Sequence, residues 1–408
     1  MRYSLAIAVT FFVFSIGNSR LMGDGIGIGD GITDDTVAIQ RAVDDASGDI
    51  RLGSGTFRIT KPIVVNLEKV GRTSFSGGGV ARIVMDGPGP AIRIVGTHDE
   101  DVSPTDVSDS VWNRQNGPMI EGIEIVGKHP QAIGIEADGT VQLTITRLIV
   151  RNCDHAIQMV RRNGNVSISQ CHLFQNAGVG CLIDQSAAQQ ITIANCHIHH
   201  NASGGIVVKK SSVQRLRIVA CDAGHNMGGA YASPTPNVLL DGADGSVTSV
   251  IIANNHFANA HFNLELRQCR GVSVTGNEFL SGRIKDAIVE ACENVVFTSN
   301  RFEATRNGMS GVSIVDSRGL TISSNQFTGV VDGDAALVLR RCQRANVTGC
   351  TILDYGRCGI LCEDVLRSRL SDNLILSDLP DSDGAPVIMK GRNDVVMNDN
   401  TAERVTEK

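Results

Sequence analysis

Residues 272–279 (Val-Ser-Val-Thr-Gly-Asn277-Glu-Phe), 295–302 (Val-Val-Phe-Thr-Ser-Asn300-Arg-Phe) and 320–327 (Leu-Thr-Ile-Ser-Ser-Asn325-Gln-Phe) share one pattern. The motif returns about every 25 residues between positions 118 and 400. Its Asn position is occupied in turn by Ile123, Leu148, Cys171, Cys196, Cys221, Asn255, Asn277, Asn300, Asn325, Cys350, Asn373 and Asn400. A repeat of this length is typical of a solenoid, in which each unit buries its apolar face against its neighbours.

The alternation inside each repeat indicates the kind of solenoid. Apolar and polar residues alternate in short runs such as Leu264-Glu265-Leu266 and Val272-Ser273-Val274. A period of two is that of a β-strand with one buried face. The repeats show neither a helical period nor the Leu-x-x-Leu-x-Leu pattern of leucine-rich repeats. We therefore expect an all-β, single-stranded parallel β-helix in which Asn side chains stack at one corner through their amides.

Composition limits the partners that the chain can have. Its 408 residues suffice for one solenoid domain, and the net charge of −6 is mildly acidic. This charge argues against a general binder of nucleic acid or of anionic membranes. The repeated position has eleven intervals, so coils about 4.8 Å apart predict a rod of roughly 53 Å.

The first residues have the features of a secretory signal peptide. Arg2 precedes an apolar run over residues 5–16, and small residues follow at Ser15 and Gly17. The run is too short to span a bilayer, and no later segment is long enough. We expect a signal peptide over residues 1–19 and a mature protein that is secreted or periplasmic.

The eleven cysteines follow the repeat. Cys171, Cys196 and Cys221 share the corner position, and other cysteines fall eight residues before it, as at Cys269 and Cys292. An odd number of cysteines at repetitive positions favours stacked core thiols over a disulfide framework.

An amphipathic helix is expected near residues 33–46. Thr33 suits the N-cap, and Asp34 and Asp35 suit the positive end of the helix dipole. An apolar stripe is formed by Ile39, Ala42, Val43 and Ala46. The end of a solenoid exposes core and strand edges, so this helix is the expected N-terminal cap.

The sequence around this helix resembles a known superfamily. Gly-Asp30-Gly-x-Thr-Asp34-Asp35-Thr-x-Ala-Ile-Gln40-x-Ala is followed by Gly53-Ser-Gly-Thr-Phe57-Arg-Ile. The two segments look like the N-terminal part of the pectate-lyase-like superfamily, which includes polygalacturonases, rhamnogalacturonases, lyases, epimerases and phage tailspikes. The resemblance implies a right-handed β-helix and, commonly, action on polysaccharide, but it does not select a reaction. It divides the chain into a cap with the first coils (20–117), the repeats (118–400) and a polar tail (401–408).

Two insertions interrupt the repeat. An acidic loop at residues 98–117 carries the only tryptophan, Trp112, and a Gly/Pro-rich loop at residues 222–237 carries Tyr231. Insertions in solenoids gather on the binding face. We therefore take Trp112 and Tyr231 as candidate substrate-binding residues; coverage of a gap by Trp112 is the alternative.

The strand after the second insertion predicts a row of charged side chains. Its outward position in successive coils reads Glu136, Val160, Asp184, Lys209, Asp241, Arg267, Glu290, Val315, Arg340 and Glu363. From this row we take Asp184, Lys209, Asp241 and Arg267 as candidate catalytic residues. Glu265 and Glu290 are candidate substrate-binding residues. The alternative interpretation is a solvated sheet with ordinary cross-strand ion pairs.

Two reactions fit this row. Asp184 and Asp241, two coils apart, could serve an inverting glycosidase, whose carboxyl groups lie about 6.5–9.5 Å apart. A lyase would use carboxylates to hold Ca²⁺ against a uronate while Lys209 or Arg267 takes the proton. Ca²⁺ is therefore the one cofactor considered, and an epimerase is not separable from a lyase.

A second row, His172, His197, Asp222, His256 and Glu278, fits either metal binding or an ordinary exposed sheet, and we assign no metal ligand there. The cations of the first row favour an acidic partner. We expect a secreted protein that cleaves an acidic, uronate-containing polysaccharide by lyase or hydrolase chemistry. The rival is a non-catalytic carbohydrate-binding or structural solenoid.

Overall fold

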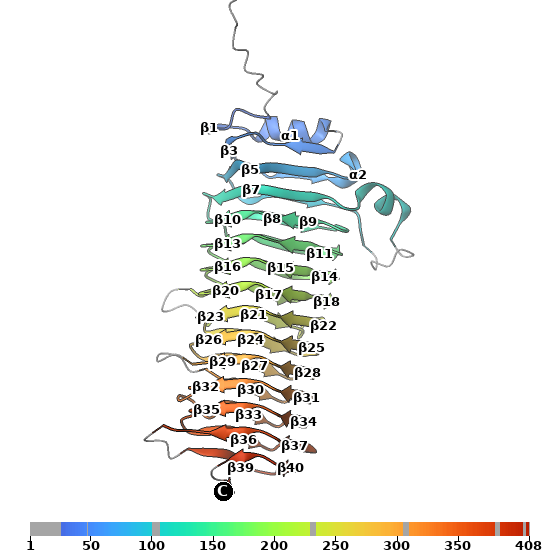
Figure 1. Cartoon of the computed structure of the whole chain (residues 1–408). Coiled ribbons are helices and arrows are strands. Elements are labelled where there is room, and N and C mark those ends of the chain that lie inside the picture. Colours follow the sequence, from blue (N-terminus) through green and yellow to red (C-terminus); the bar gives the residue numbers. More distant parts are fainter. Residues whose placement is uncertain are drawn as a thin grey trace, which may run out of the picture.

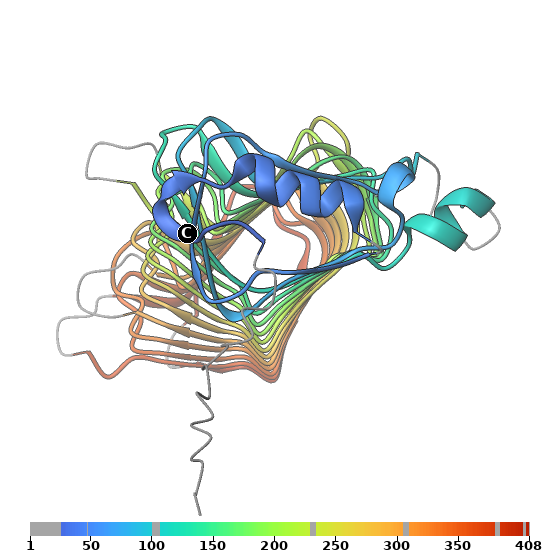
Figure 2. The same ribbon diagram turned by 90° about the horizontal axis from the view of Figure 1, so that it is seen from above.

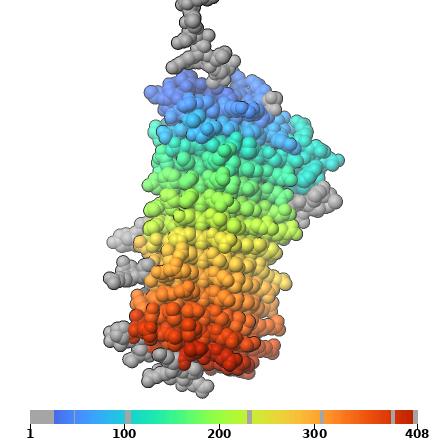
Figure 3. All heavy atoms as spheres, viewed as in Figure 1, coloured from blue at the N-terminus to red at the C-terminus, as the bar shows by residue number. Residues whose placement is uncertain are grey.

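The chain forms a parallel β-solenoid of about 14 turns (Figure 1), as the sequence predicts. The computed structural model describes residues 26–46, 48–99, 107–228, 234–304, 310–379, 384–402 and 405–407. The expected signal peptide lies outside these residues. In the space-filling view the coils stack without interruption from the N-terminal to the C-terminal end (Figure 3).

Three parallel sheets, here called faces 1, 2 and 3, run along the rod. Face 1 consists of β4 (Ile63–Asn66), β6 (Gly89–Val95), β8 (Ala132–Asp138), the first parts of β11 (Ile157–Gly164) and β14 (Cys181–Gln189), β17 (Ile206–Lys209), β21 (Pro236–Asp241), β24 (Phe262–Arg267), β27 (Lys285–Glu290), β30 (Val312–Val315), β33 (Leu337–Arg340), β36 (Cys358–Glu363), β39 (Ala385–Lys390) and β42 (Val405–Glu407). The last parts of β11 and β14 turn the corner and continue toward β18 of face 2. This face carries the candidate site.

Face 2 consists of β2 (Asp49–Arg51), the first parts of β5 (Ser74–Met85) and β7 (Met119–Gly127), β9 (Thr144–Thr146), β12 (Ser167–Ser169), β15 (Thr192–Ala194), β18 (Ser212–Gln214), β19 (Arg217–Val219), β22 (Ser246–Ala253), β25 (Cys269–Thr275), β28 (Glu293–Thr298), β31 (Arg318–Ser323), β34 (Gln343–Thr348), β37 (Ser368–Ser371) and β40 (Val395–Asn398). Face 3 consists of β1 (Asp30–Asp34), β3 (Gly55–Ile59), the last parts of β5 and β7, β10 (Ile149–Arg151), β13 (His172–Phe174), β16 (His197–His199), β20 (Asp222–Gly224), β23 (His256–Ala258), β26 (Glu278–Leu280), β29 (Arg301–Glu303), β32 (Gln326–Thr328), β35 (Thr351–Leu353), β38 (Leu374–Leu376) and β41 (Thr401–Ala402). The strands β41 and β42 lie within the segment predicted as a polar tail.

The predicted corner ladder is present. Each Asn side chain accepts from the backbone N–H of the preceding coil and donates its amide to the Asn of the next, as in Asn255, Asn277 and Asn300, where the bonds are 2.9–3.0 Å. Cys350 interrupts the run, and Asn373 with Asn400 resumes it. Stacked amides therefore satisfy the buried backbone of this corner.

A second buried ladder was not predicted. It runs through Asn176, Asn201, Asn226, Asn237, Asn263 and Asp286 at the entrance to face 1, with amide bonds of 2.8–3.0 Å. Asp286 ends the ladder because both of its carboxyl oxygens accept, from Asn263 and from the backbone N–H groups of Gly282 and Gly311.

The predicted cap helix is α1 (Thr36–Asp45), which lies across the first coil (Figure 2). Ile39 and Val43 are fully buried, and the Gln40 side chain bonds both the N–H and the C=O of Val64 on strand β4. The predicted N-cap was wrong. Thr33 lies in β1, and the N-cap is Asp35, whose carboxylate instead accepts from two backbone N–H groups of residues 28–29.

The cysteine prediction is confirmed, since all eleven cysteines are free and buried. The two other helices are short. They are α2 (Leu67–Val70) and the π-helical turn η1 (Val111–Gln115), which projects at the side of the rod (Figure 1). Among the described residues no helix has the length and apolar character needed to cross a bilayer.

Candidate functional site

The outward row of face 1 forms in the predicted order from Val160 onward. Asp184 pairs with Lys209, and Asp241 with Arg267, on neighbouring parallel strands. Arg267 in turn lies opposite Glu290. The alternation of buried Leu264 and Leu266 with outward residues turns these side chains away from the core. The row thus presents charges on one surface at the spacing of successive strands, about 4.8 Å.

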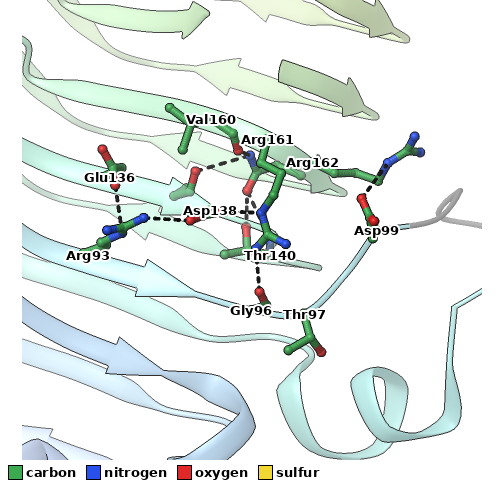
Figure 4. A network of polar contacts seen from close by, with 12 residues as sticks. Arg93, Gly96, Thr97, Asp99, Glu136, Asp138, Thr140, Val160, Arg161 and Arg162 are labelled. Atoms are coloured by element: carbon green, nitrogen blue, oxygen red, sulfur yellow. Dashed lines mark hydrogen bonds and ion pairs between the residues drawn. The ribbon is translucent and has the colours of Figure 1, made fainter. Parts of the chain in front are cut away.

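The start of the row differs from the prediction. Val160 pairs with Asp138, whereas Glu136 pairs two residues earlier in the strand. Glu136 was aligned two residues too early, because Asp138 is the residue that, like Val160, directly precedes the left-handed corner residue of its coil (Gly139 after Asp138, Arg161 after Val160). Asp138 is bonded by Arg93 and by Arg161, which also donates to the Gly96 carbonyl (Figure 4). This network ties three coils together.

At one end of the candidate site Asp184 and Lys209 form an ion pair of 3.5 Å. The other oxygen of the carboxylate, Asp184 Oδ1, is buried and has no hydrogen-bond partner in the described part of the chain. His155, which sequence reasoning missed, lies close enough for both charges to act on it. Burial lowers the pKa of His155, and its Nδ1 accepts from the Val179 N–H at 3.0 Å. The neutral ring therefore carries its proton on Nε2.

At the other end Arg267 connects two carboxyl groups. It contacts Asp241 at 3.8 Å and donates a short hydrogen bond to Glu265. Glu265 lies outward between Leu239 and Ile288 of the neighbouring strands, and its side chain is only 7% exposed. Burial raises the pKa of Glu265 despite the guanidinium beside it.

The two carboxyl groups therefore have different environments. Asp241 is more exposed than Glu265, at 22%, and its carboxylate also accepts from the Ala243 N–H. Glu265 is held by burial toward its neutral form. Neighbouring carboxyl groups in such different surroundings can divide the roles of general acid and general base. Neither the burial nor the shared arginine is readable from the sequence, because both depend on packing between coils.

The aromatic candidate Trp112 is not brought to this group. Trp112 packs with Val107, Val111 and Val141 beside η1. Val141 follows β8, and Asp241 lies on β21, four strands further along face 1. At the usual strand spacing these two strands are about 19 Å apart. The prediction for Tyr231 falls outside the described residues.

Lys285 is a further residue that is not among the predicted site residues. It is the first residue of β27, the strand after Glu265, and its Nζ is buried without a hydrogen-bond partner in the described ranges. Gly333, which is 48 residues further along the sequence, lies beside this Nζ. No signal in the repeat itself distinguishes this lysine from an exposed one.

The second row lies on face 3 in the predicted register. His172 stacks on His197 with ring centroids 4.8 Å apart, and His197 Nδ1 is 3.8 Å from Asp222. His256 is bonded to Glu278 at 2.8 Å. Within the described residues no three or more His, Cys, Asp or Glu side chains are arranged to hold a metal ion.

Two family models match parts of the chain. Residues 108–242 match the right handed beta helix region, and residues 222–402 match the periplasmic copper-binding protein NosD. The cysteines of the second stretch are buried in the core, and its described residues offer no group of three metal ligands. No curated protein matches the chain.

Solved structures match over most of the length. The A-module of the mannuronan C-5 epimerase AlgE6 of Azotobacter vinelandii has a TM-score of 0.61 at 16% identity, covering 93% of this chain and 98% of that one. The AlgE4 A-module of the same organism gives 0.58 at 14% identity, covering 93% and 98%. The Dettilon tailspike protein gives 0.58 at 15% identity, covering 91% of this chain and 66% of that one.

At these identities the likeness concerns the fold. It agrees with the repeat, with the three parallel faces and with the N-terminal cap. The chain therefore has the parallel β-helix fold that its resemblance to the pectate-lyase-like superfamily implies, and its residues 108–242 match the right handed beta helix family model.

Proposed function

We propose that the protein cleaves an acidic, uronate-containing polysaccharide on face 1 between β14 and β24. One observation supports this most directly. Asp241 and Glu265 lie on adjacent strands, share Arg267 and differ in burial. The cations Lys209 and Arg267 in the same row suit a substrate with carboxylates. That the named structural neighbours include a mannuronan epimerase agrees with a sugar substrate.

Hydrolysis is the reaction that this geometry favours. Glu265, whose pKa is raised by burial, would give its proton to the glycosidic oxygen that leaves. Asp241 would take a proton from the water molecule whose oxygen bonds to the anomeric carbon. This pair replaces Asp184 and Asp241 of the sequence interpretation, which are two coils apart. In the lyase alternative, Lys209 would take the proton beside the uronate carboxylate, and carboxylates such as Asp184 would hold Ca²⁺.

A non-catalytic carbohydrate-binding solenoid is the second candidate. It is favoured by the ion pairs of the row, because Asp184 with Lys209 and Asp241 with Arg267 satisfy one another without a substrate. Such pairs also occur on sheets with no other role. For either function we propose a secreted or periplasmic location, which agrees with the description of the NosD family as periplasmic.

The test is incubation of the protein with a panel of acidic polysaccharides, with and without Ca²⁺, followed by two measurements. New reducing ends without ultraviolet absorbance of unsaturated uronates are expected for a hydrolase. Both signals together would indicate a lyase. The reducing ends should disappear in Asp241→Ala but persist in Glu293→Gln, a control carboxylate on face 2 that bonds Arg318 at 2.6 Å. Binding without either signal would contradict cleavage and support the non-catalytic alternative.

A further inference from the structure

Lys285 occupies an unusual position on face 1. It lies on β27, next to the strand that carries Glu265, and its neighbour Asp286 is fully buried, so the lysine points outward. Its Nζ is nevertheless buried and makes no hydrogen bond within the described residues. The amine packs against Gly333, where an added Cβ would lie 3.4 Å from Nζ.

The charges around Lys285 are already paired with one another. Asp334 accepts from Arg340 at 2.5 Å and lies 3.7 Å from Arg357. Arg340 also bonds Glu363 at 2.8 Å. The carboxylates of Asp334 and Glu363 are thus taken up by the two arginines, and Lys285 is a third cation beside them. The arginines hold Asp334 so that Lys285 is left without its own acceptor.

An amine in this position is costly to the folded state. A buried cation without a hydrogen-bonded partner destabilises the folded state. Burial accordingly lowers the pKa of Lys285, although Asp334 and Asp286 act in the opposite direction. Groups kept at such a cost are concentrated at sites that bind or react. The side chains of Arg340 and Asp334 are 31% and 45% exposed, so the group opens to solvent.

We propose that Lys285 and Arg340 form a second binding site on face 1, which takes a carboxylate of an acidic sugar in the coils that follow the Asp241–Glu265 pair. The carboxylate supplies the acceptor that the amine lacks. A polymer lying along the rod would reach both places, because β27 adjoins β24. This inference rests on the proposed function for the identity of the polymer.

The first test compares the affinity and the stability of the wild type and Lys285→Met. The probes are hexamers of galacturonate and of mannuronate, with a neutral maltohexaose control, measured by titration calorimetry. We expect at least one uronate hexamer to bind and Lys285→Met to bind it roughly tenfold or more weakly, the usual value of a charge-assisted hydrogen bond. The Tm of the ligand-free variant should equal or exceed that of the wild type, because a buried unpaired amine has been removed.

Two further variants complete the test. Lys285→Arg keeps a cation and should retain affinity within a few-fold. Lys128→Met, which removes an exposed lysine paired with Asp86 at 3.2 Å, should change neither quantity. Unchanged affinity in Lys285→Met, or a loss of affinity together with a lower Tm, would overturn the proposal, since the second result indicates a structural lysine.

The outcomes for the two proposals can be told apart. If the wild type binds uronate hexamers through Lys285 but releases no reducing ends, the result contradicts cleavage and supports the binding site. If the Lys285→Met variant binds and cleaves like the wild type, the result contradicts the binding site and supports cleavage. Failure of the wild type to bind either uronate hexamer contradicts the site proposed here.

Discussion

Glu265 is the residue on which the proposed chemistry depends most. Replacing it with Gln keeps the shape of the side chain but removes the transferable proton. We expect cleavage to fall by roughly 10²–10⁴-fold, the usual contribution of general acid catalysis. Because burial raises the pKa of Glu265, wild-type activity should decline as the pH rises through that pKa. Initial rates of reducing-end formation across a pH series measure both effects.

The control for this variant is Glu293→Gln, since Glu293 lies on face 2. Its rate and pH profile should match the wild type. If Glu265→Gln cleaved at the wild-type rate, the carboxyl group would be structural and the assignment of the general acid would be wrong.

The buried carboxyl group of Asp286 should make the free energy of unfolding depend on pH. Burial raises its pKa to about 6 from the usual 3.8. The folded state then holds a proton that the unfolded state releases, so the free energy of unfolding should fall as the pH rises from about 4 to 6. A difference of this size corresponds to on the order of 3 kcal/mol. Urea unfolding at a series of pH values measures the slope.

Asp286→Asn supplies the comparison, because the amide does not titrate. The variant should lack the part of the slope that the wild type shows between these pH values. Equal slopes in the two proteins would mean that other groups are responsible. Only the difference between the curves is informative, since other carboxyl groups titrate in both.

At the scale of residues, the sequence predicts which side chains are neighbours better than it predicts how buried each one is. The period of two and the repeat of about 25 residues fix which residues neighbour one another, and the row from Asp184 to Glu290 forms accordingly. The same reasoning missed that Glu265 is buried and that Lys285 is covered. Burial of an outward residue depends on flanking side chains and on loops from other coils, which the repeat does not encode.

At the scale of elements, the corner ladder offers a direct test of how the coils are held together. Asn300 accepts two hydrogen bonds from Asn277 and donates to Asn325 and to the Val274 carbonyl. Asn300→Ala leaves these buried groups unsatisfied, so we expect a loss of about 2–5 kcal/mol in the free energy of unfolding. Chemical denaturation followed by circular dichroism measures it.

The matched control is Asn346→Ala, an amide of β34 on the outward side of face 2. It should change the free energy of unfolding by less than about 0.5 kcal/mol, as surface substitutions usually do. Similar losses in both variants would show that the stacked amides are not a special source of stability.

Helix α1 shows which of its features local sequence patterns predict and which they do not. The apolar stripe of α1 was readable because packing follows the helical period, and Ile39 and Val43 are buried as expected. The start of the helix could not be predicted in the same way. Thr33 has a side chain that suits an N-cap, but its backbone N–H and its hydroxyl both donate to the Asp30 carboxylate within β1. Asp35 becomes the N-cap residue, and its carboxylate accepts hydrogen bonds from the backbone N–H groups of Ile28 and Gly29. These tertiary hydrogen bonds outweigh the local preference for Thr33 as the N-cap.

For the whole molecule, the sequence predicted architecture more completely than function. A repeated unit that cannot bury its own apolar face specifies stacking, and the continuous core follows from it. The reaction depends instead on a few outward side chains whose surroundings differ from coil to coil. The likeness to an epimerase and a tailspike at about 15% identity reflects this, because the fold is shared while the outward residues are free to change.

The stacked construction also predicts how damage spreads. Phe279, Phe302 and Phe327 stack in the core with ring centroids 4.7 Å apart. Phe302→Ala should cost about 3–5 kcal/mol. Because each coil contacts only its neighbours, hydrogen exchange should rise in β26, β29 and β32 and stay unchanged in β14 and β17, which carry Asp184 and Lys209. Exchange measured by mass spectrometry would show this gradient. A uniform loss of protection would instead mean that the solenoid unfolds as one unit, and the proposed site would then lose its activity with the distant core.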